Sequence, residues 1–196
     1  MTYWDPMPTA RELETGPLPA PGGGTWLPDP AYGGWWNHRP DRWEERDWRN
    51  VPGPFYGAGT DNCWMGRLIA PANVLYEDEW GAEFVYRQPR DAEETLAVLG
   101  AAAQDPMGGH ACDGDDRWTP ELVRDWWRER DRVREWAVAL DRTWSVSERE
   151  DEREAAGGAR AYVAHIDDGL AAYLRGYLFR LAEGRPPAPG ENLPGL

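Results

Sequence analysis

Apolar and polar side chains alternate with a period of two residues over Ala82–Gln88, which is the spacing of a β-strand. The preceding run, Val74–Glu79, forms the other arm of a predicted antiparallel hairpin, with Trp80-Gly81 near the turn between them. Asn62–Ile69 is a further candidate strand, which ends before Pro71. The sheet is expected to be small and antiparallel, because nothing in this part of the chain is long enough for a helical crossover.

Apolar positions three and four residues apart predict helices in the second half of the chain. Asp91 and Glu94 have the spacing of a capping box and begin a helix that ends near Ala103. Thr119-Pro120 begins a longer helix, because threonine caps a helix well and proline suits the first turn. The apolar stripe of this longer helix comprises Leu122, Trp126, Val133, Ala137, Leu140 and Trp144.

The spacing of Ser147 and Glu150 suggests a second capping box. The helix after it extends to Glu183, with Gly157-Gly158 as a candidate break. We therefore expect a small antiparallel sheet of about three strands, packed against two long antiparallel helices and one shorter helix. This arrangement belongs to the α+β class.

The chain divides by composition into three parts. Residues 1–51 predict an extended arm, because proline and glycine recur too often for long helices or central strands. Disordered segments are poor in aromatic residues, so this arm is expected to pack on the body. Its indoles belong to Trp4, Trp26, Trp35, Trp36, Trp43 and Trp48. Residues 52–185 are expected to form a single α+β domain, and residues 186–196 a flexible tail rich in proline and glycine.

Composition narrows the classes of function. The 196 residues include 35 Asp or Glu against 21 basic residues, all arginine, which gives a net charge of −14. Binding to duplex DNA is disfavoured, because it depends on clustered positive charge. We see no apolar stretch of about 18 residues for a membrane span, and no pattern of a signal peptide. Two cysteines cannot make a disulfide framework, so an intracellular, cytoplasmic protein with free thiols is expected.

Negative charge is concentrated in residues 51–118, which hold twelve acidic residues and four arginines. An acidic surface of this kind attracts a basic partner, and an exposed indole can anchor it. The candidate partner-binding residues are Glu77, Asp78, Glu79, Trp80, Glu83 and Trp64. Immunity proteins and antitoxins are commonly small, acidic and non-catalytic, and composition suggests this class by analogy. Acidic hairpins that serve solubility alone are the alternative.

A second hypothesis is a small enzyme that uses residues 110–116. His110, Cys112 and Asp113, together with Cys63, could supply a nucleophile and a base. His110, Asp113, Asp115 and Asp116 are the alternative metal ligands. However, the segment lacks the spacing of a calcium loop, and no CxxC or HxxxH pair completes a zinc site. Loop Asp and Gly commonly form turns, so no cofactor is expected.

Stacking on nucleic-acid bases would need exposed, coplanar indoles, for which Trp35, Trp36 and Trp43 are the candidates. Their acidic surroundings argue against that role. The arm can pack on its own body or on a neighbour's, as in a swapped dimer, and the sequence leaves both arrangements open. The tail is a further candidate as a docking peptide.

Overall fold

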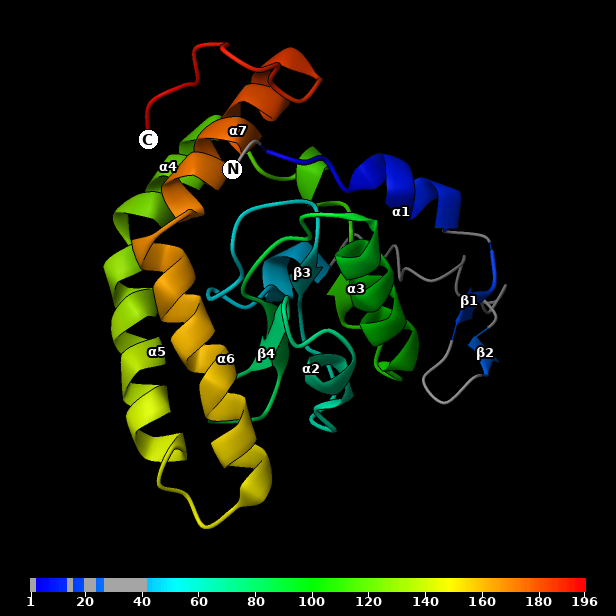
Figure 1. The fold of residues 1–196 in the computed structure, drawn as a ribbon, viewed down its shortest axis with the longest axis vertical. Coiled ribbons are helices and arrows are strands. Elements are labelled where there is room, and N and C mark those ends of the chain that lie inside the picture. The colour runs from blue at the N-terminus through cyan, green and yellow to red at the C-terminus, as the bar shows by residue number, and fades with distance from the viewer. Residues whose placement is uncertain (1–2, 14–15, 20–23, 27–41) are drawn as a thin grey trace. The chain divides into compact units, whose positions relative to one another are not determined.

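The computed structural model describes residues 3–13, 16–19, 24–26 and 42–196 (Figure 1). Its helices and short antiparallel strand pairs place the chain in the α+β class. The chain divides into two compact units. The first, Trp4–Arg117, is called the N-terminal unit, and the second, Trp118–Leu196 together with Tyr3, is called the helical unit. The division falls inside residues 52–185, for which the sequence predicts a single domain.

The N-terminal unit contains short antiparallel strand pairs. Strand β4 (Val74–Tyr76) pairs antiparallel with β5 (Glu83–Val85), with Val74 opposite Val85, so the predicted hairpin is present. Strand β3 (Tyr56–Gly57) pairs with β6 (His110–Ala111). The pairing of β1 (Leu18–Pro19) with β2 (Thr25–Trp26) is separate from both. The strands therefore form separate two-stranded pairs, whereas the sequence predicts one sheet of about three strands.

The segment predicted as a strand at Asn62–Ile69 is instead a short helix, α2 (Met65–Ile69). Trp64 precedes it in the left-handed region, with φ of 58°. Gly66 lies against the side chain of Glu83, where a Cβ atom would come within 2.1 Å of Oε2. A helix backbone seated on a carboxylate is a tertiary contact, which the local pattern of apolar residues does not encode.

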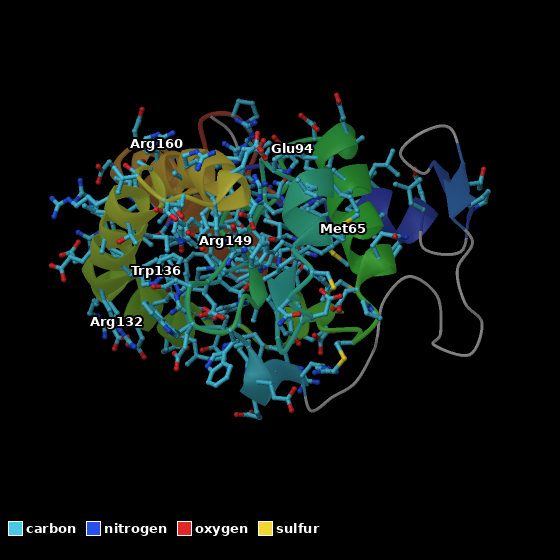
Figure 2. All side chains as sticks on the ribbon, turned by 90° about the horizontal axis from the view of Figure 1, so that it is seen from below. Met65, Glu94, Arg132, Trp136, Arg149 and Arg160 are labelled. Carbon is cyan, nitrogen blue, oxygen red and sulfur yellow. The ribbon has the colours of Figure 1, made fainter. Side chains whose placement is uncertain are left out.

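Helix α3 (Ala92–Gln104) begins where the sequence predicts. The Asp91 side chain accepts a hydrogen bond of 2.9 Å from the backbone N–H of Glu94, which is one half of a capping box. The Glu94 carboxylate accepts instead from the backbone N–H of Arg90, at 3.0 Å, and from its guanidinium. Glu94 is labelled in Figure 2, among the side chains of the N-terminal unit.

The core of the N-terminal unit joins helix α1 (Met7–Leu13) to α3 and the hairpin. Its buried members are Met7, Ala10, Phe55, Ala70, Val74, Val85, Val98, Leu99, Ala101, Ala102 and Cys112. Helix α1 lies within the segment predicted as an extended arm. The 3-10 helix η2 (Arg42–Glu45) also lies there, and its Trp43 packs edge-on against Tyr56 with centroids 5.4 Å apart. Trp35 and Trp36 lie outside the described residues.

The helical unit contains α4 (Pro120–Arg128), α5 (Arg130–Trp144), α6 (Glu150–Asp167) and α7 (Leu170–Glu183). Helices α5 and α6 run side by side in opposite directions (Figure 1). Thr119 caps α4 by accepting a hydrogen bond of 3.3 Å from Leu122, as predicted. The long predicted helices are interrupted at Glu129 and at Asp168–Gly169. Gly157 and Gly158, the candidate break, lie inside α6.

Arginines on the helical unit pair with acidic side chains of the same unit. Arg134 makes two hydrogen bonds to Asp167, at 2.7 and 2.8 Å. Arg149 and Arg160, labelled in Figure 2, pair with Asp151 and Asp141. These side chains are largely exposed, and such pairs contribute little to stability.

The C-terminal segment lies against the helical unit and is described to its last residue. Arg185 pairs with Glu191 at 2.5 Å, and Arg124 donates a hydrogen bond of 3.1 Å to the carbonyl of Gly195. None of the helices in the described ranges combines the length and the apolar character needed to cross a membrane.

Candidate functional site

The turn between β4 and β5 is built around the carboxylate of Glu77. This side chain is only 4% exposed, and it accepts hydrogen bonds from the backbone N–H groups of Glu79, Trp80 and Ala82, at 2.6, 2.7 and 3.0 Å. The N–H of Glu77 itself donates to the carbonyl of Ala82 at 3.0 Å. A carboxylate held by three amide donors fixes the backbone of the whole turn.

Gly81 closes the same turn with φ of 75°, a conformation that favours glycine. A Cβ atom there would come within 2.5 Å of Nε1 of Trp64. Trp64 in turn stacks on the buried ring of Tyr76, with centroids 4.6 Å apart and planes 10° apart. Trp64 is half-buried, and its indole lies between Gly81 of the turn and the ring of Tyr76.

The hairpin tip, defined here as Asp78, Glu79 and Trp80, is exposed. The indole of Trp80 is 75% exposed, although Glu77 holds the backbone that carries it. The tip thus presents one large aromatic ring beside two carboxylates on a backbone of defined shape. Of the six predicted partner-binding residues, these three face solvent, Trp64 is half-buried, and Glu77 and Glu83 are buried.

Glu83 lies beneath the surface, where it joins three segments of the chain. Its Oε2 lies 3.3 Å from Nε2 of His110, and both side chains are 2% exposed. Its Oε1 accepts a hydrogen bond of 2.9 Å from the backbone N–H of Arg67 in α2. Its own N–H donates to Oγ1 of Thr60 at 2.6 Å. Glu83 therefore ties β5 to α2, to β6 and to the loop before α2.

His110 is held in a strongly acidic environment. Burial acts to lower the pKa of His110, but the hydrogen bond and charge of Glu83, with the charges of Asp105 and Asp61, outweigh it and raise the pKa above its usual value. The Nδ1 atom of the ring has no hydrogen-bond partner among the described residues. Asp105 itself accepts from the backbone N–H groups of Asp61, Met107 and Gly109.

The two cysteines occupy different environments. Cys63 is exposed, and the hydrogen bond and the charge of Asp61 raise the pKa of its thiol. A raised pKa disfavours the thiolate, which is the opposite of what activates a nucleophilic cysteine. Cys112 is buried in the core of the N-terminal unit. The arrangement therefore gives no support to a cysteine nucleophile.

The other predicted ligands serve local structure. Asp113 accepts a hydrogen bond of 2.6 Å from the hydroxyl of Tyr56 and one of 2.9 Å from Nε of Arg117. Burial, and then the bond to Asp113, raise the pKa of Tyr56 far above its usual value. Asp115 and Asp116 belong to the short 3-10 helix η3 (Gly114–Asp116). Within the described ranges, no three His, Cys, Asp or Glu side chains form a group that could hold a metal ion.

Sequence reasoning missed the roles of Glu77, Glu83 and Asp105. Each is a buried acid whose carboxylate oxygens accept hydrogen bonds from backbone N–H groups. In the sequence alone, such an acid cannot be distinguished from one on the surface. The sequence held a signal only for Glu77, which stands four residues before Gly81, a residue type that is common in turns. Comparisons with protein-family models, with curated proteins and with solved structures find no match to this chain.

Proposed function

We propose that this chain is a non-catalytic protein-binding module that engages a basic protein through its hairpin tip. The observation that carries the proposal is the exposed indole of Trp80 on a backbone fixed by Glu77. Tryptophan dominates the binding energy of many interfaces when a partner covers it. A backbone that is already ordered loses little entropy on binding, so more of the contact energy contributes to affinity.

Charge gives the proposed partner its sign. Asp78 and Glu79 come directly before Trp80 and are exposed, and the whole chain carries a net charge of −14. Electrostatic complementarity mainly raises the association rate and selects among partners, whereas the covered indole slows dissociation. This division of roles suits an immunity protein or an antitoxin that neutralises a basic toxin in the cytoplasm.

The test begins with capture of proteins from a lysate of the encoding organism on the immobilised full chain at low salt. A captured protein is accepted as the partner only if substitutions in the hairpin tip change its binding. Trp80→Ala should weaken its binding about 30-fold, the equivalent of about 2 kcal/mol. Asp78→Asn combined with Glu79→Gln should slow association and flatten the dependence on salt.

Two matched controls separate the tip from generic attraction. Val146→Ala removes an apolar side chain that is 81% exposed in the helical unit, and it should leave the affinity unchanged. Asp116→Asn with Glu148→Gln removes two exposed charges elsewhere and should change the association rate much less than the tip double variant. Equal effects of the two double variants, with no effect of Trp80→Ala, would contradict the proposal.

A further inference from the structure

We infer that the binding surface continues from the hairpin tip onto α2, and that its partner is a basic segment with a row of apolar side chains along one face. This inference rests on the proposed function and specifies the partner of the same site. It depends on two further exposed side chains, Met65 and Leu68, which are 40% and 58% exposed. Met65 is labelled in Figure 2.

Helix α2 has one buried face and one open face. Gly66 is buried against Glu83, and Ile69 packs partly buried against the core of the N-terminal unit. Met65 and Leu68 are three residues apart, which places them on one face of the helix, one turn from each other. Because the backbone of α2 is tied to Glu83 through the N–H of Arg67, this open face has a defined orientation.

The hairpin tip and the start of α2 are neighbours in space. Gly81, the residue after Trp80, packs against the indole nitrogen of Trp64 and the Cβ atom of Asn62. Trp64 is the residue before Met65. On the other side of the turn, Glu83 begins β5 and carries the backbone of α2. Trp80 and Met65 therefore stand on two adjoining segments that share one support.

Three large apolar side chains on adjoining exposed segments are more than the isolated surface hydrophobics that every protein has. Methionine adapts its shape to different partners, which suits a binding surface. Asp78 and Glu79, the exposed acids directly before Trp80, give the tip a negative charge, which repels anionic lipid headgroups and attracts cationic side chains. Charge complementarity therefore favours a basic, amphipathic polypeptide segment as the occupant.

The test uses the full chain and two synthetic helical peptides of equal length and equal positive charge. One has leucine along one face and lysine on the other, and the second has alanine in place of each leucine. By fluorescence anisotropy of labelled peptide, the wild-type chain should bind the leucine peptide at least tenfold more tightly. A wild type that does not distinguish the two peptides overturns the inference.

Variants of α2 then localise the preference. Met65→Ser and Leu68→Ser should each reduce the preference for the leucine peptide three- to tenfold, and Leu68→Met should retain it. Val146→Ser, in the helical unit, is the matched control and should have no effect. Circular dichroism and the thermal midpoint verify that each variant is folded, which is expected because these side chains are exposed.

The same measurements distinguish the two proposals. If Trp80→Ala weakens the leucine peptide and the α2 variants do not, the proposed function stands and the extension onto α2 is wrong. If the α2 variants weaken binding and Trp80→Ala does not, the binding surface consists of α2 alone. The proposal that the hairpin tip binds the partner and the inference that the surface continues from the tip onto α2 are then both wrong. If none of them matters, the leucine peptide binds at another place on the chain, and both proposals fail.

Discussion

Buried acids in the N-terminal unit are neutralised mainly by backbone N–H groups. Glu77, Glu83 and Asp105 all accept hydrogen bonds from backbone N–H groups, and Glu83 also contacts the ring of His110, whose pKa is raised. Hydrogen bonds to a charged acceptor are stronger than neutral ones, and a buried donor left without its acceptor is destabilising. These residues therefore determine the shape of the loops rather than their surface charge.

Removing the Glu77 carboxylate should release the turn. We expect Glu77→Ala to lower the free energy of unfolding by about 2 kcal/mol, because three amide donors lose their acceptor. Urea denaturation measures the loss. Glu79→Ala, two residues further along the same turn and exposed, should change the free energy of unfolding by less than about 0.5 kcal/mol. Equal losses in the two variants would show that Glu77 does not hold the turn.

His110 should make stability depend on pH in one direction. Its pKa in the folded chain is raised above the ordinary value of 6.5. The stabilising contribution is therefore fully present below about pH 6.5 and is lost as the pH rises through the raised folded value. The difference in unfolding free energy between wild type and His110→Asn should shrink from pH 6 to pH 9. The control His165→Asn, on α6, leaves the Glu83–His110 pair intact and should therefore keep its pH-dependent stabilisation. If the difference between wild type and His110→Asn did not change with pH, the pairing of His110 with Glu83 would not be what stabilises the fold.

At the scale of elements, glycine decides where the long helical segment is interrupted. Gly169 stands between α6 and α7 with φ of 110°, a conformation that L side chains rarely adopt. Gly157 lies inside α6, and a Cβ atom there would meet nothing nearer than 3.8 Å. The paired glycines are tolerated in the helix, and the single glycine is required at the break.

Replacing glycine by alanine should have opposite effects on the free energy of unfolding at these two positions. Gly169→Ala should lower the free energy of unfolding by at least about 1 kcal/mol, because alanine is strained at this φ. Gly157→Ala should raise it by about 0.5–1 kcal/mol, because alanine favours a helix interior and has room. Urea denaturation of both variants measures the two effects. Effects of the same sign would mean that the break is not set by Gly169.

Local signals in the sequence predicted the elements that depend on local chemistry. Asp91 and Thr119 cap α3 and α4 because a side-chain oxygen reaches an N–H three residues on, which is readable from spacing. The segment that became α2 was misread because Gly66 is selected by its contact with Glu83, seventeen residues later. The break at Glu129 has no comparable signal, since neither Gly nor Pro marks it.

At the scale of the whole molecule, charge counted along the sequence overstates charge offered to a partner. Residues 51–118 carry most of the excess of acids, but Glu77, Glu83 and Asp105 face inward and their carboxylates bind N–H groups of the same chain. Of the acids in the predicted partner-binding surface, only Asp78 and Glu79 of the hairpin tip are therefore exposed. Which acids turn inward depends on contacts across 27 residues, as between Glu83 and His110, and composition contains no trace of that pairing.

The exposure of Cys63 gives the chain a natural attachment point for a spectroscopic reporter. It lies in the loop that supports the hairpin tip, and the chain's other cysteine, Cys112, is buried. A thiol-reactive dye should therefore modify a single position of the folded chain, without any engineered cysteine. Because Asp61 raises the pKa of this thiol, coupling should be carried out on the alkaline side of neutrality. With thirteen tryptophans obscuring intrinsic fluorescence, such a dye would report docking at the tip alone.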